Sequence, residues 1–197
     1  MIKIVHRVNK IEELKNIPKG YGVEVDVRAF GKRLILNHEP YEDGDSLEEY
    51  LKSFEHRFII FNIKDTGIEN DVIELAEKFG IENYFLLDIE YPFTYKATRN
   101  RKFGKIAVRY SEAEPIEFAL AHSGLIDWVW IDTFTLMPLD KEIYNRLKQA
   151  GFKICLVCPD QFGRSEDIPV YKEKIKRDGI EIDAVMAELE NIDKWDD

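Results

Sequence analysis

Short apolar runs rich in β-branched and aromatic residues recur at fairly even intervals along the chain. They predict eight strands, at residues 3–8, 22–30, 58–65, 84–89, 105–111, 128–134, 152–159 and 182–188. Charged segments with helical periodicity lie between most of them, most clearly at residues 69–78, 139–150 and 166–177. Alternation of strands and helices is typical of a parallel sheet, and about eight repeats predict a closed α/β barrel of the (β/α)8 TIM type. We expect a short barrel that spans residues 1–197 as a single domain, with a doubly wound open sheet as the alternative.

A tight turn is expected at Gly31-Lys32, directly after the second predicted strand. Residues 33–39 would then return as an added strand and form a hairpin with it. The chain contains neither a G-x-G-x-x-G nor a G-x-x-x-x-G-K-[ST] sequence, so no motif supports a nucleotide-binding fold.

The two cysteines, Cys155 and Cys158, have C-x-x-C spacing, which is found in metal and redox sites. The run around them predicts a buried strand, and side chains three residues apart on a strand point to opposite faces. Thiols on opposite faces cannot share a zinc ion, and the chain has no second cysteine pair. We therefore expect buried, reduced thiols.

The composition is that of a soluble globular protein, with 45% hydrophobic and 34% charged residues. A formal net charge of −10 argues against broad electrostatic binding to nucleic acid, so an anionic substrate would need a local basic cluster. No apolar run approaches the length of about 18 residues that spans a bilayer. The first residues lack the zones of a signal peptide, and we expect a cytoplasmic protein with no stable membrane anchor.

The second predicted strand alternates strictly between apolar and charged residues. Val23, Val25 and Val27 would share one face, and the opposite face would carry three charged residues: Glu24, Asp26 and Arg28. In a barrel strand that second face points inward, where unpaired carboxylates are costly and call for a metal ion or a cationic partner. An amphipathic strand with one solvated face is the alternative, but it suits an antiparallel sheet better than a parallel one.

Other predicted strands also end in polar residues. These are His6 and Arg7 on the first, Asn62, Lys64 and Asp65 on the third, Asp88 and Glu90 on the fourth, Arg109 on the fifth, Asp132 on the sixth and Glu188 on the eighth, while His38 closes the added hairpin. Catalytic groups of a TIM barrel collect at the carboxyl ends of its strands. A single polar residue at the end of a strand more often marks the start of a loop. The prediction of a catalytic site therefore rests on how many strands end in such residues.

This set of residues suits phosphoryl transfer. Paired acids favour a hard divalent cation such as Mg²⁺ or Ca²⁺. Arginine and lysine bind phosphate oxygens, and two imidazoles can act as general base and general acid near neutral pH.

Four short motifs occur in the order His6-Arg7, Glu24-Val25-Asp26, His38-Glu39 and Asn62-Ile63-Lys64. In order, approximate spacing and strand placement they resemble the H-R, E-x-D, H-D and E-x-K motifs of the glycerophosphodiester phosphodiesterase family. This family belongs to the phospholipase-C-like TIM-barrel phosphodiesterases and implies a place in lipid metabolism. The resemblance covers residues 1–65.

The resemblance implies a role for each matched residue. His6 and His38 would be the acid–base pair, Arg7 and Lys64 would hold the phosphate, and the metal ligands would be Glu24, Asp26 and Asn62. Asn62 replaces an acid of the family pattern, so metal affinity should fall, because an amide oxygen donates less charge than a carboxylate. Glu39 stands where the family has aspartate, and Val8 where it has glycine. Further candidates for the site are Arg28, Asp88, Glu90 and Arg109, and Asp88 or Glu90 could compensate for Asn62.

Three functions stay open on this basis. The first is a phosphodiesterase that acts on a small glycerol- or sugar-type phosphodiester, by hydrolysis or by cyclisation. The second is a degenerate relative that binds a phosphorylated ligand without turnover. The third is a sugar-phosphate isomerase or aldolase that uses Lys64 as base or Schiff-base nucleophile. The sequence predicts neither the leaving group nor the oligomeric state.

Overall fold

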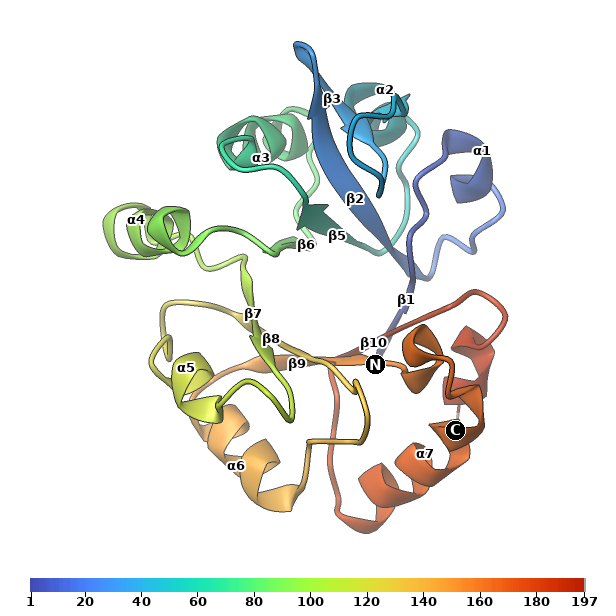
Figure 1. Ribbon diagram of the computed structural model, residues 1–197, viewed down its shortest axis with the longest axis vertical. Helices are drawn as coiled ribbons and strands as arrows, with labels where there is room; N and C mark the ends of the chain where they lie inside the picture. The colour runs from blue at the N-terminus through green and yellow to red at the C-terminus, as the bar shows by residue number, and fades with distance from the viewer. Residues whose placement is uncertain (197) are drawn as a thin grey trace. The chain divides into compact units, whose positions relative to one another are not determined.

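The computed structural model describes residues 1–196 as a mixed α/β protein with a sheet of ten strands (Figure 1). The chain packs into two compact units, one formed by Ile4–Tyr95 and the other by Met1–Lys3 with Lys96 and the residues that follow. The organisation of the chain as a single domain stays a prediction.

The unit Ile4–Tyr95 is built around strand β2 (Gly22–Phe30). The first part of β2 is parallel to the end of β1 (Ile2–Val5) and to β5 (Phe58–Ile63), and β5 is parallel to β6 (Tyr84–Leu87). Helices in this unit are α1 (Ile11–Leu14), α2 (Leu47–Lys52), α3 (Glu69–Lys78) and the first residues of α4 (Tyr91–Arg101). All six residues of β5 are buried, as expected for a parallel strand covered on both faces.

The far part of β2 forms the expected hairpin with β3 (Arg33–Leu36), and β3 pairs with the short strand β4 (Asp45–Ser46). Gly31 at the turn has a φ of 64°, in the left-handed region that favours glycine. Strand β3 ends at Leu36, before the predicted end at residue 39, although the Asn37 amide still donates to the Asp26 carbonyl at 3.0 Å. The residues that follow belong to a loop that returns at β4.

The other unit contains four parallel strands in the order β7 (Ala107–Tyr110), β8 (Trp128–Ile131), β9 (Lys153–Val157) and β10 (Ala184–Ala187). The Ile2 amide donates to the Asp183 carbonyl, which attaches the start of β1 to this set. Helices α5 (Ile116–Leu120), α6 (Lys141–Gln149) and α7 (Ile168–Arg177) lie on one side of these strands in Figure 1. Three 3₁₀ turns, Pro159–Phe162, Ser165–Asp167 and Ile192–Trp195, complete the unit.

Each of the eight predicted strands is present, mostly in a shorter form. Helix α3 coincides with the prediction, α6 is shorter by two residues at its start and one at its end, and α7 begins two residues later than predicted. The sequence did not predict α4, whose buried residues include Thr94 and Thr98, so no clean apolar stripe marks it. Within residues 1–196 no helix has the length and hydropathy needed to cross a bilayer, and the cytoplasmic location stays a prediction.

Both cysteines are buried and form no disulfide, as the strand pattern predicted. Burial raises the pKa of the Cys158 thiol to about 12, and the pKa of Cys155 is raised further for the same reason. The Trp195 indole N–H donates to the Cys158 sulfur at 3.3 Å. The pair therefore acts as packing rather than as a reactive dithiol.

We expect both thiols to resist alkylation in the folded protein. At pH 8 only about one Cys158 side chain in ten thousand is a thiolate at this pKa, and the thiolate is the nucleophile. Iodoacetamide labelling followed by mass spectrometry should find no label in buffer and two labels in guanidinium chloride. Rapid labelling of the native protein at pH 8 would contradict the buried placement.

Candidate active site

Polar side chains of β1, β2 and β5 gather within the unit Ile4–Tyr95. Val5 pairs with Val23, which brings His6 beside Glu24, and Asp26 pairs with Asn62. Because residues two apart on a strand share a face, Glu24, Asp26 and Asn62 lie on the same side of the sheet. All three side chains are buried, with about 1% of Glu24 and of Asp26 exposed. The inward-facing acids predicted from the alternation of β2 are therefore buried and close together.

The Glu24 carboxylate is held by donors from both neighbouring strands. One oxygen, Oε2, accepts the Arg7 backbone N–H at 2.8 Å, and the other accepts the Asn62 amide at 2.9 Å. His6 Nε2 lies 4.0 Å from Oε2. Arg7 has a φ of 52°, a strained conformation for a residue other than glycine. Burial, and then the neighbouring Asp26 carboxylate, raise the pKa of Glu24 above its ordinary value.

The Asp26 carboxylate is held by two cations and an amide. Asn9 donates to Asp26 Oδ2 at 2.8 Å, and the Asp26 backbone N–H donates back to Asn9 Oδ1 at 2.8 Å. Lys64 Nζ lies 3.1 Å from Asp26 Oδ1, and Arg7 Nε lies 3.6 Å from Oδ2. These contacts offset the cost of burying the acid.

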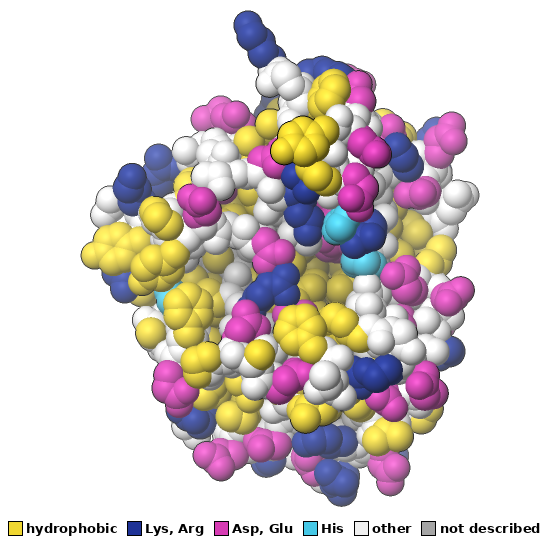
Figure 2. All heavy atoms as spheres, viewed as in Figure 1, with side chains coloured by type: hydrophobic (Ala, Val, Ile, Leu, Met, Phe, Trp, Pro, Cys, Tyr) yellow, Lys and Arg dark blue, Asp and Glu magenta, His cyan; other side chains and the backbone are white. Residues whose placement is uncertain are grey.

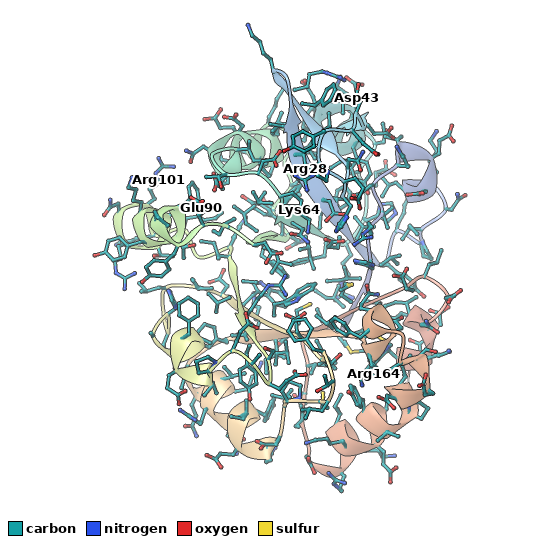
Figure 3. All side chains as sticks on the ribbon, in the orientation of Figure 1. Arg28, Asp43, Lys64, Glu90, Arg101 and Arg164 are labelled. Atoms are coloured by element: carbon teal, nitrogen blue, oxygen red, sulfur yellow. The ribbon has the colours of Figure 1, made fainter. Side chains whose placement is uncertain are left out.

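The hairpin supplies His38 and its neighbours. His38 Nδ1 lies 2.7 Å from Glu39 Oε1, and this hydrogen bond is the main cause that lowers the pKa of Glu39, with smaller contributions from Arg7 and Arg28. Arg28 binds the His38 carbonyl and the Asp65 carboxylate. Arg28 and Lys64 are labelled in Figure 3 and lie near each other, since the Lys64 amide donates to the Val27 carbonyl. In Figure 2, histidine atoms lie next to lysine or arginine atoms on the viewed face.

The remaining sequence candidates lie elsewhere. Asp88 follows β6 with a φ of 58°, and the Glu90 carboxylate accepts the Thr66 hydroxyl at 2.9 Å, at the loop after β5. Arg109 belongs to the other unit, where it pairs with the buried Asp132 carboxylate. Burial raises the pKa of Asp132 despite this pair. The geometry thus brings together the residues of the four motifs and Arg28, all of which lie within Ile4–Tyr95.

Sequence reasoning missed Asn9, which makes two hydrogen bonds to Asp26. Its only signal was a polar residue two positions after the His6-Arg7 motif, at a place where a loop begins. Polar residues are common at such places, so the pattern could not single it out.

The chemistry of the donor set fits a divalent cation bound through oxygen. Each oxygen of Glu24 and Asp26 has at least one N–H donor, and the buried Asn62 Oδ1 has no hydrogen-bond partner. An amide oxygen without a donor next to two carboxylates is a typical ligand for Mg²⁺ or Ca²⁺. Within residues 1–196 no cluster contains three or more His, Cys, Asp or Glu side chains in metal-ligand geometry. The set would therefore hold a cation with two charged ligands.

No family model and no curated protein matches the chain. Solved structures do match. A glycerophosphoryl diester phosphodiesterase from Parabacteroides distasonis has a TM-score of 0.67 at 13% identity, with 98% of this chain and 85% of that chain covered. A glycerophosphodiester phosphodiesterase from Agrobacterium tumefaciens has a TM-score of 0.66 at 14% identity, over 95% and 97% of the two chains. An Oleispira antarctica phosphodiesterase, solved with its product sn-glycerol-3-phosphate, has a TM-score of 0.61 at 16% identity, over 94% and 92%.

These matches define the fold class, an α/β TIM barrel, and confirm that prediction. More particularly, the chain has the fold of the glycerophosphodiester phosphodiesterases, so the resemblance seen in the four motifs extends to the fold. The roles of the individual residues stay predictions.

We expect Asn9→Ala to lower the free energy of unfolding by about 1–3 kcal/mol, because it removes a donor from the buried Asp26 carboxylate and an acceptor from its backbone N–H. Urea unfolding measures the change. Asn16→Ala is the matched control, since the Asn16 side chain is exposed and donates to the Glu12 carbonyl at the protein surface. Its effect should stay within about 0.5 kcal/mol. Equal effects of the two variants would contradict the role of Asn9.

Proposed function

We propose that this protein is a divergent glycerophosphodiester phosphodiesterase that cleaves a small glycerol- or sugar-type phosphodiester. One observation carries the proposal: β1, β2 and β5 bring together residues of three motifs, and contacts of Arg28 and Arg7 link the fourth motif to them, in a protein with the fold of that family. The product complex of the Oleispira antarctica phosphodiesterase supports a glycerol phosphate as the kind of group that the site would hold.

Arg7 and Lys64 would bind the phosphate. Both cations lie within 4 Å of Asp26, so they are already fixed before a substrate arrives. The Arg7 side chain is about half exposed, which leaves part of its guanidinium open to a ligand. A planar guanidinium can hold two phosphate oxygens at once, and the ammonium adds a compact charge.

His6 and His38 would move the protons. Glu24 Oε2 lies 4.0 Å from His6 Nε2, and Glu39 Oε1 lies 2.7 Å from His38 Nδ1, so a carboxylate lies beside each imidazole. One imidazole takes the proton from the attacking water, or from a neighbouring substrate hydroxyl, as the new P–O bond forms. The other gives its proton to the oxygen of the leaving alcohol as the old P–O bond breaks. Water yields a phosphomonoester and the alcohol, whereas an internal hydroxyl yields a cyclic phosphate and the alcohol.

Glu24, Asp26 and Asn62 would hold the divalent cation. When bound, the cation would stabilise the negative charge on the phosphoryl oxygens. The protein's own part is to keep these three oxygens together, through the β2–β5 register and the donors on each carboxylate.

A binding protein without turnover is the second candidate, and Asn62 is the observation that favours it, since it leaves the cation with one charge fewer than the family pattern supplies. The isomerase or aldolase hypothesis loses support, because Lys64 Nζ lies 3.1 Å from Asp26 Oδ1 and is engaged by that buried carboxylate.

We expect turnover of glycerophosphodiesters or bis(p-nitrophenyl) phosphate in Mg²⁺, Ca²⁺ or Mn²⁺. His6→Ala and His38→Ala should each lower turnover on the order of a hundredfold or more, since each removes a proton-transfer group. Product formation is followed by phosphate NMR or p-nitrophenolate absorbance.

His56→Gln is the control for these variants, because His56 binds the Ile17 carbonyl and belongs to none of the four motifs. It should keep the wild-type rate. If the wild type turned over none of these phosphodiesters with any of the three cations, and a phosphorylated ligand stabilised it in EDTA, the function would be binding without turnover.

We expect Asn62→Asp to tighten Mg²⁺ or Ca²⁺ binding on the order of tenfold or more, since it adds a charged oxygen ligand at nearly constant volume. The measurement is the cation-dependent shift in Tm, with Asn83→Asp as a control outside the four motifs. Equal shifts in the wild type and Asn62→Asp would contradict the placement of the cation.

A further inference from the structure

We propose that Arg28 is a positioning residue that holds His38 in place by fastening the His38 carbonyl to the loop after β5. The inference rests on the proposed function, in which His38 transfers a proton. Arg28 carries this role through contacts with the protein and not through contact with the phosphate.

The contacts of Arg28 are specific and well shielded. Its side chain is 15% exposed. Nε and Nη2 donate to the His38 carbonyl at 3.2 and 2.9 Å, and Nη1 donates to Asp65 Oδ1 at 2.7 Å. One guanidinium therefore joins a backbone carbonyl of the hairpin to a carboxylate of the loop after β5, a geometry that the planar fork of arginine permits.

Asp65 is itself fixed. Its second oxygen, Oδ2, accepts the Ala29 backbone N–H at 2.8 Å, so the carboxylate is bound to β2 at two places. Lys64 precedes Asp65 and lies against Asp26. The fastening therefore connects His38 to the strand pair that carries the phosphate-binding lysine.

His38 lies beyond the end of β3, so its backbone is not held by the hydrogen bonds of that strand. Asn37 is the last residue in register, through its amide bond to the Asp26 carbonyl. The loop then leaves the sheet, and Tyr41 is almost fully exposed with a φ of 67°. The Glu39 carboxylate, which orients the imidazole, is also exposed. The Arg28–carbonyl bonds are thus a partly buried contact that holds the backbone of His38.

The placement of an imidazole matters strongly for proton transfer, since a displacement of about 1 Å can cost on the order of a hundredfold in rate. Arg28→Lys keeps the charge but cannot bind both acceptors with a planar fork. Asp65→Asn leaves Arg28 intact and removes the charge that anchors it. Arg33→Lys is the matched control, because Arg33 pairs with Asp43 on the same hairpin and both side chains are more than half exposed.

The experiment measures kcat and KM of the four proteins on one phosphodiester, with Tm as a check of folding. Arg28→Lys and Asp65→Asn should lower kcat on the order of tenfold or more and change KM less than about twofold. Arg33→Lys should match the wild type. In a His38→Ala background Arg28→Lys should cause no further loss, since its effect passes through His38.

Hydrogen–deuterium exchange gives a readout that does not need turnover. Backbone amides of residues 37–40 should exchange faster in Arg28→Lys and Asp65→Asn than in the wild type and Arg33→Lys. If Arg28→Lys fails to fold, Asp65→Asn carries the test alone.

Three outcomes overturn the inference. A higher KM at unchanged kcat would make Arg28 a direct phosphate ligand. Unchanged kcat and exchange in both variants would leave it without a positioning role. An additional loss in the His38→Ala background would mean that Arg28 acts independently of His38. An inactive wild type would overturn the proposed function and the positioning role of Arg28 with it, whereas an active wild type with a fully active Arg28→Lys overturns the inference alone.

Discussion

Glu24 and Asp26 are two carboxylates buried on the same face of one strand, and the polar contacts around them follow from that burial. Neither acid could be buried there without nearby donors, because a desolvated, unpaired carboxylate costs several kcal/mol. The donors come from two directions: the turn after β1 supplies Asn9 and the Arg7 backbone N–H, and the end of β5 supplies Asn62 and, directly after the strand, Lys64. The hydrogen bonds and ion pairs around Glu24 and Asp26 thus compensate for the burial of these two carboxylates.

The burial of these acids has a cost. Burial, and then the neighbouring Asp26 carboxylate, raise the pKa of Glu24, which is unfavourable for folding at neutral pH, since the ionised form is the one that burial penalises. A pair of apolar residues at these positions would pack without that cost. Two buried acids next to two cations and the His6 imidazole are the pattern expected where stability has been exchanged for function.

The sequence predicted the parts of this arrangement that depend on periodicity. The alternation in β2 gave the inward face of Glu24 and Asp26, and the strand count gave the barrel. Hydrogen bonds between residues far apart in sequence could not be predicted, which is why Asn9 was missed and Arg28 had no assigned partner. Helix α4 was missed because polar threonines are buried on it, and Arg109 was grouped with the site only because it ends a strand.

Arg7 combines two demands in one residue, with consequences for how the site can change. Its left-handed backbone delivers an N–H to Glu24, while its side chain approaches Asp26. Glycine or asparagine would tolerate that backbone more easily, but neither carries a guanidinium, and lysine would keep a charge without the fork. Few substitutions of Arg7 can therefore satisfy both demands. Lys64 has no positive φ, so a substitution there has to replace only the side-chain contact with Asp26.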